Sequence, residues 1–91
     1  MNELNYLQQL AVDVKENIEG DVKLIKQHLK KRNGETAQSV LDGLNSNFFL
    51  FKSICEKRIN EDNKEEVYKL INEVHSWWVD IDDEMFEKIN C

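Results

Sequence analysis

The sequence predicts an all-α protein, an elongated up-down-up antiparallel three-helix bundle. Apolar residues recur at steps of three and four along three long segments, which is the helical period. No segment alternates with the period of a strand. With 41% hydrophobic residues over 91 positions, the chain can build one core, and we expect residues 1–91 to form a single helical domain.

We expect the first helix over residues 3–32, because its apolar positions hold the helical period throughout. These positions are Leu4, Leu7, Ala11, Val14, Ile18, Val22, Ile25 and Leu29. The cations at positions 30–32 complement the negative end of a helix dipole. The Asn33-Gly34 pair that follows is expected to supply the left-handed residue that ends the helix.

The second and third helices are expected over residues 36–60 and 64–89. The apolar positions of the second are Ala37, Val40, Leu41, Leu44, Phe48, Phe51, Cys55 and Ile59. Those of the third are Val67, Leu70, Ile71, Val74, Trp78, Ile81, Met85 and Ile89. Asn63, with Glu66 three residues later, resembles a capping box at the start of the third helix.

Helices of this length span about 37–45 Å, and connections of only a few residues make consecutive helices antiparallel. A domain of this size buries only about 60–65% of the surface of its unfolded chain, which limits its stability. The sequence therefore leaves two assemblies open: a self-contained bundle, or a bundle that is completed by dimerisation.

The net charge of −6 is concentrated in the last third of the chain. Residues 1–34 carry six bases against five acids, and residues 35–60 carry three of each. Residues 61–91 carry three bases against ten acids, a net charge of −7. Five of these acids lie near the end of the third helix, where the helix dipole opposes them: Asp80, Asp82, Asp83, Glu84 and Glu87. Four of the five are candidate partner-binding residues: Asp80, Asp83, Glu84 and Glu87. Two explanations stay open, pairing with the basic segment 23–32 or recognition of a basic partner.

The second and third helices carry more apolar residues than one buried face can hold. The residues off their core stripes are Phe49, Leu50, Ile54, Tyr68, Trp77, Val79 and Phe86. Exposed apolar patches mark protein contacts, and aromatic residues are frequent interface anchors, so we expect these residues to bind a partner. The alternative is that they are buried at the seams between helices.

No group of residues has the spacing of a catalytic or cofactor site, so we expect no enzyme activity, no cofactor and no metal. His28 and His75 lack a second His or Cys one turn away, which a zinc pair needs. Carboxylate pairs such as Glu16 and Glu19 point away from the apolar stripe of their helix, toward solvent. The acidic balance also disfavours nucleic acid as a partner.

These observations favour a small, acidic, cytoplasmic protein that binds other proteins and forms a homodimer through its second and third helices. The first alternative is an acidic inhibitor (an immunity protein, antitoxin or phage-encoded antagonist) that presents carboxylates to a basic site and mimics nucleic acid. The second is a metal-dependent nucleotide hydrolase built on paired carboxylates. We expect the cytoplasm and no membrane contact, because the first residues lack the basic segment of a signal peptide and no apolar run approaches about 20 residues. The two cysteines, Cys55 in the core and Cys91 at the end, are too few for a disulfide framework.

Overall fold

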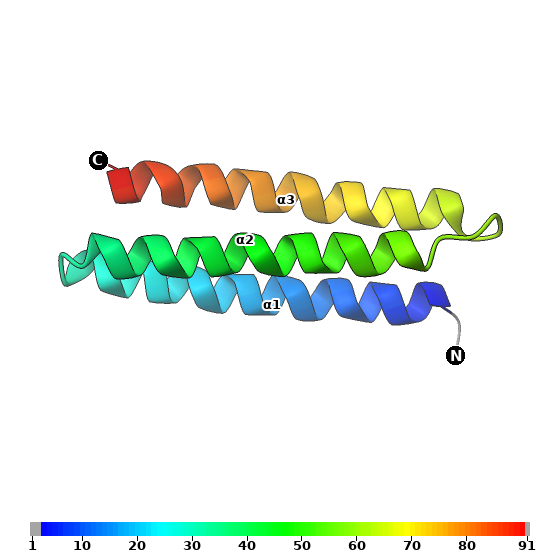
Figure 1. Cartoon of the computed structure of the whole chain (residues 1–91), viewed down its shortest axis with the longest axis horizontal. Coiled ribbons are helices and arrows are strands. Elements are labelled where there is room, and N and C mark those ends of the chain that lie inside the picture. Colours follow the sequence, from blue (N-terminus) through cyan, green and yellow to red (C-terminus); the bar gives the residue numbers. More distant parts are fainter. Residues whose placement is uncertain (1–2, 91) are drawn as a thin grey trace.

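The computed structural model describes residues 3–90, and within them the chain forms three α-helices and no strand. They are α1 (Glu3–Lys30), α2 (Gly34–Lys57) and α3 (Lys64–Asn90). Each helix runs antiparallel to the one before it, and the whole trace measures 49 × 20 × 15 Å (Figure 1). The predicted all-α, up-down-up three-helix bundle is confirmed. Cys91 lies outside the described residues.

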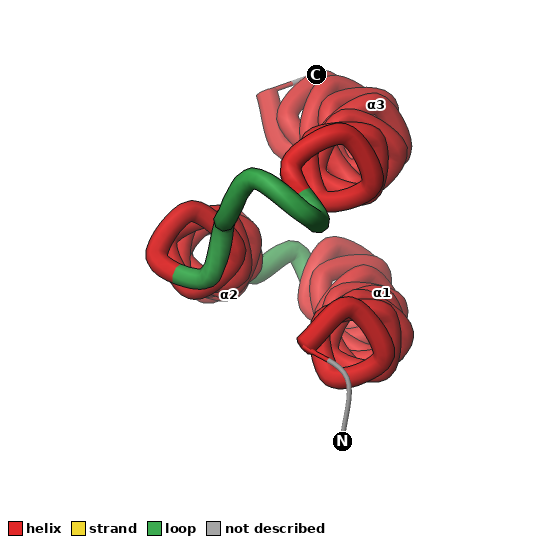
Figure 2. Tube along the Cα trace, turned by 90° about the vertical axis from the view of Figure 1, so that its right-hand side faces the viewer, coloured by secondary structure: helices red, strands yellow, loops and turns green. Residues whose placement is uncertain are grey.

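The three helices form a triangle in cross-section, with α2 on one side and α1 and α3 on the other (Figure 2). The core fills the space between them and draws on the predicted stripe of each helix. Its buried members are Leu7, Ala11, Val14, Ile18, Ile25, Ala37, Leu41, Leu44, Phe48, Phe51, Cys55, Val67, Ile71, Val74 and Met85. Burying each large apolar side chain contributes about 1.5–3 kcal/mol, so these stripes supply the main stabilisation of the bundle.

The α1–α2 connection differs from the prediction. The left-handed residue is Arg32, with φ 59°, whereas Gly34 has no positive φ and opens α2. The N–H of Asn33 donates to the carbonyl of His28 at 2.8 Å, and the N–H of Arg32 donates to that of Leu29 at 3.0 Å. This pair of bonds is the Schellman motif, so α1 ends at Lys30 and not at residue 32.

Helix α2 begins two residues earlier than expected because Asn33 caps it. The side-chain oxygen of Asn33 accepts from the backbone N–H of Thr36 at 3.3 Å. The backbone carbonyl of Asn33 accepts from the N–H of Ala37 at 3.1 Å. One residue therefore closes the end of α1 with its N–H and starts α2 with its two oxygens.

In the α2–α3 connection, the predicted capping box is wrong. Asn63 does precede α3, and its carbonyl accepts from the N–H of Val67 at 2.9 Å. Its side chain turns back into the loop, where Oδ1 accepts from the N–H of Asn60 at 2.8 Å and Nδ2 donates to the carbonyl of Arg58 at 3.2 Å. Asn63 is buried, and its amide forms hydrogen bonds with these two backbone groups of the loop.

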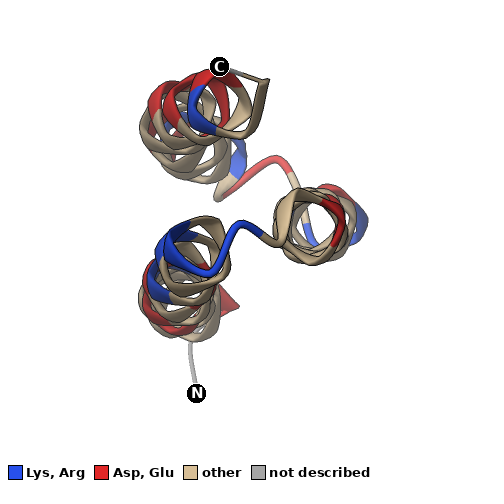
Figure 3. Cartoon of the chain, turned by 90° about the vertical axis from the view of Figure 1, so that its left-hand side faces the viewer, with Lys and Arg blue, Asp and Glu red and all other residues tan. Residues whose placement is uncertain are grey.

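The basic end of α1 and the acidic end of α3 lie at the same pole of the bundle, as charge pairing between them requires (Figure 3). The ion pairs found among the described residues do not join these two ends. Glu84 pairs with Lys88 of its own helix at 3.4 Å, and Glu3 pairs with Arg58 of α2 at 3.5 Å. The acids of α3 are therefore near the cations of α1 without a direct contact to them. None of α1–α3, over the residues described, has an apolar stretch suited to crossing a membrane.

Candidate functional site

An aromatic cluster joins α2 to α3 near their midpoints. The rings of Phe48 and Trp78 stack with centroids 4.5 Å apart, and Phe49 meets the edge of Trp78 at 5.6 Å. His75 contacts both Phe48 and Trp78, at 5.6 and 5.7 Å. The indole N–H of Trp78 donates to the side-chain oxygen of Asn45 at 2.9 Å, which fixes the ring in place. This cluster defines which flank of each helix faces the other.

Four of the predicted partner-binding residues lie on the outer side of this seam. Tyr68, Val79 and Phe86 fall close to the helical direction of His75, so they flank α2. Phe49 flanks α3 through its contact with Trp78. We call Phe49, Tyr68, Val79 and Phe86 the α2/α3 strip. Phe49, Tyr68 and Phe86 are 56%, 46% and 56% exposed, and Val79 is half-buried.

Leu50 lies on the opposite flank of α2. Asn47, one turn earlier on the same side, donates to the carboxylate of Asp21 in α1 at 3.5 Å, so this flank faces α1. Leu50 is 61% exposed there. Two exposed residues of α1 lie toward the same side: Tyr6, whose ring contacts Arg58 of α2, and Leu24, one turn after Asp21. We call this group, Tyr6, Leu24 and Leu50, the α1/α2 strip. The structure thus separates Phe49 from Leu50, although they are adjacent in sequence.

The other two predicted apolar residues are less accessible. Ile54 and Trp77 are half-buried and pack against the core. The ammonium of Lys15 in α1 lies 5.8 Å from the centre of the Trp77 ring, so this indole sits at the α1–α3 seam. Burial at a seam, which was the alternative explanation, accounts for both residues.

The predicted acidic residues Asp80, Asp83, Glu84 and Glu87 are all exposed. They spread over the outer face of α3 and do not converge. Among residues 3–90, no cluster of three or more His, Cys, Asp or Glu side chains has the geometry to hold a metal ion. Asp82, which was not among the predicted site residues, is half-buried between Val79 and Phe86 on the α2/α3 strip.

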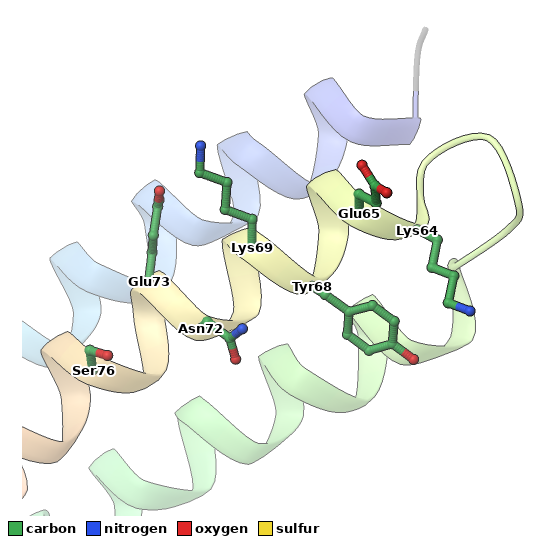
Figure 4. Close-up of a pocket in the computed structure, with 7 residues that line it drawn as sticks. All are labelled: Lys64, Glu65, Tyr68, Lys69, Asn72, Glu73 and Ser76. Atoms are coloured by element: carbon green, nitrogen blue, oxygen red, sulfur yellow. The ribbon is translucent and has the colours of Figure 1, made fainter.

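A shallow hollow runs along the outside of α3 (Figure 4). All its lining residues belong to that helix: Lys64, Glu65, Tyr68, Lys69, Asn72, Glu73 and Ser76. Tyr68 and Lys64 extend to one side of the helix, whereas Lys69 and Glu65 extend to the other. With no second wall and diverging side chains, this surface does not enclose a small molecule as a ligand site does.

Among residues 3–90, two titratable groups have shifted pKa values, and neither is placed for catalysis. Burial, with a smaller contribution from neighbouring Glu56, raises the pKa of the Cys55 thiol to about 11. The thiol is therefore protonated at neutral pH and inert as a nucleophile. Partial burial raises the pKa of Asp21, whose carboxylate accepts from Asn47.

The described residues present two apolar strips and an acidic helix face, and they bring together no convergent set of reactive groups. Comparison of the chain with protein-family models, with curated proteins and with solved structures finds no match.

Proposed function

We propose that this chain is a non-enzymatic interaction module that binds another protein through the α2/α3 strip. The observation that carries the proposal is the line of exposed aromatic residues on that strip. Tyr68 and Phe86 are eighteen residues apart on one side of α3, about 27 Å along the helix. Exposed aromatic side chains in such a row are typical anchors of a protein interface.

The α2/α3 strip is better prepared for binding than the α1/α2 strip. Phe49 rests against Phe48 and Trp78, with both centroid distances at 5.6 Å, so its ring is held before any partner arrives. A side chain that is already ordered loses little entropy on binding. On the α1/α2 strip, the guanidinium of Arg58 already covers the ring of Tyr6, 4.7 Å from its centroid.

A second candidate function is that of an acidic inhibitor, which would bind a basic site on a target protein. The observation that favours it is the exposure of Asp80, Asp83, Glu84 and Glu87 along the outside of α3. Binding through these carboxylates alone would weaken steeply with ionic strength, whereas binding through the aromatic strip would keep an apolar contribution that salt does not screen. For either function we propose the cytoplasm, supported by the buried Cys55, which forms no disulfide.

Two adjacent substitutions test the proposed surface. Phe49→Glu places a charge on the α2/α3 strip, and Leu50→Glu places the same charge on the opposite flank of α2, at a similarly exposed position. We expect immobilised wild-type protein and Leu50→Glu to retain the same partner from the cells that make the protein, and Phe49→Glu to lose it. Retention by Phe49→Glu, with circular dichroism showing all three proteins folded, would remove the α2/α3 strip as the binding surface.

A thermal-shift screen separates this function from the nucleotide-hydrolase alternative. A protein that binds Mg²⁺, Mn²⁺ or nucleotides in its folded state melts at a higher temperature in their presence. We expect no change in Tm with any of them. A rise of several degrees would instead favour an enzyme.

A further inference from the structure

Carboxylates outnumber cations around the α2/α3 strip. Asp82 and Asp83 lie between Val79 and Phe86, one turn from each, and so stand on either side of the strip. On α2, an acid lies seven residues before and another seven residues after Phe49, on the same face: Asp42 and Glu56. The neighbouring cations are Lys52 and Lys64, both toward the end of the strip where α3 begins.

Helix α3 also carries a second seam, parallel to the one that faces the core. Its residues step by four and three along the helix: Tyr68, Asn72, His75, Val79, Asp82 and Phe86. This is the spacing of the contact positions in a coiled coil. It lies one residue ahead of the core-facing series Val67, Ile71, Val74, Trp78, Ile81 and Met85. The second seam therefore has the spacing that another helix could pack against. Its six positions include both apolar and polar side chains.

We infer that the occupant of the α2/α3 strip is a basic amphipathic helix from another protein, laid along α3 with a cation opposite Asp82. The inference rests on the proposed function and adds the chemistry of the partner. Asp82 is already half-buried, and an apolar helix laid over it would remove the remaining water from its carboxylate. An unpaired buried carboxylate is strongly unfavourable, so the helix must bring Lys or Arg to that point.

A second copy of this chain fits the strip less well. In a parallel twofold arrangement, Asp82 of one copy would meet Asp82 of the other. In an antiparallel arrangement centred on Phe49, Asp42 would lie opposite Glu56, because the two acids are equally far from that residue. Like charges that face each other across an interface suppress pairing, so both arrangements disfavour self-association through this face.

Two designed peptides test the inference. Both are three-heptad helices with leucine at every contact position, and they differ only in carrying lysine or glutamate at the flanking positions. We expect the lysine peptide to bind the full chain about tenfold more tightly or better, by titration calorimetry. The tryptophan emission of the chain should change on binding, because Trp78 contacts Phe49.

Reversing the charges beside the strip is the most decisive part of the experiment. In the variant Asp82→Lys/Asp83→Lys we expect the preference to invert, so that the glutamate peptide binds more tightly. Phe86→Glu should abolish binding of the lysine peptide, whereas Val12→Glu, a similarly exposed position on α1, should leave it unchanged. Each variant is checked for helicity by circular dichroism before titration.

Three results would overturn the inference: equal affinity for the two peptides, a preference that charge reversal leaves unchanged, or no binding of either peptide. If sedimentation then shows a dimer that Phe49→Glu dissociates, the strip is an interface between copies. In that case the proposal of an interaction module is retained, and only the proposal of a basic helix as the partner is rejected. If instead the lysine peptide binds as expected but Phe49→Glu retains the cellular partner, the proposed function fails and the peptide preference stands.

Discussion

At the scale of single residues, neighbours in sequence have unlike surroundings. Phe49 packs on the α3 side of α2, and Leu50 lies on the α1 side. Their apolar character is visible in the sequence, but the flank that each occupies depends on the order of the helices around the bundle. A helical projection gives the angle between two side chains and not the identity of the helix that each one meets. The structure was needed to divide the predicted surface into two strips.

Cys55 gives a direct test of core packing. Its pKa is raised from about 9 to about 11, chiefly by burial. We predict that a disulfide reagent at pH 8 modifies Cys55 far more slowly in the native protein than in guanidinium chloride. The measurement uses Cys91→Ser, so that a single thiol reports. Equal rates in the two states would show that the core opens around α2.

The same shift makes stability depend on pH in the alkaline range. The thiol loses its proton near pH 9 in the unfolded chain and near pH 11 in the folded one. The contribution of the protonated thiol to the free energy of unfolding is therefore fully present below pH 9 and is lost as the pH rises to 11. We predict that the free energy of unfolding falls more steeply over this range in the Cys91→Ser protein than in the same protein carrying Cys55→Ala. Parallel curves would contradict the assigned shift.

At the scale of helices and their connections, Arg32 occupies a conformation that suits glycine. Its φ of 59° places it in the left-handed region, where a Cβ costs about 1 kcal/mol. We predict that Arg32→Gly raises the free energy of urea unfolding by about 1 kcal/mol. Arg32→Ala is the control, since it removes the same charge and keeps the Cβ. If both variants change stability equally, the backbone strain at Arg32 is not the cause.

The two asparagines that precede α2 and α3 should contribute different amounts to the free energy of unfolding. Asn33 is exposed and makes one cap bond, so Asn33→Ala should cost about 1 kcal/mol. Asn63 is buried and holds the backbone at both Asn60 and Arg58. We predict that Asn63→Ala costs about 2–3 kcal/mol in urea unfolding, since it strands two loop groups. A smaller loss at Asn63 than at Asn33 would contradict this account of the loop.

The helical stripes were predictable and the connections were not, for a physical reason. A stripe requires only that apolar residues recur with the helical period, which the chain shows from Leu4 to Ile89. At the α1–α2 turn, glycine preference pointed to Gly34, yet Arg32 is left-handed because Asn33 is needed as the cap of α2. The same sequence pattern at Asn63 also fits two structures. The side chain can cap the following helix, or it can form hydrogen bonds with the backbone of the preceding loop, as it does here.

At the scale of the whole molecule, the acid of α3 and the cations of α1 meet at one pole without ion pairs between them among the described residues. The shared pole follows from antiparallel helices and could be predicted. The absence of contact could not, because it depends on the separation of α1 and α3 and on local pairing such as that of Glu84 with Lys88. The acids Asp80, Asp83, Glu84 and Glu87 of α3 are exposed to solvent.

Photo-crosslinking in the cells that make the protein tests the central claim most directly, that another protein contacts the α2/α3 strip. Benzoylphenylalanine replaces Phe86 on that strip or, as the control, Leu50 on the opposite flank of α2, both of which are more than half exposed. We predict that irradiation gives a discrete higher-mass adduct from position 86 and none from position 50. An adduct from position 50 alone, or from neither position, would contradict the account.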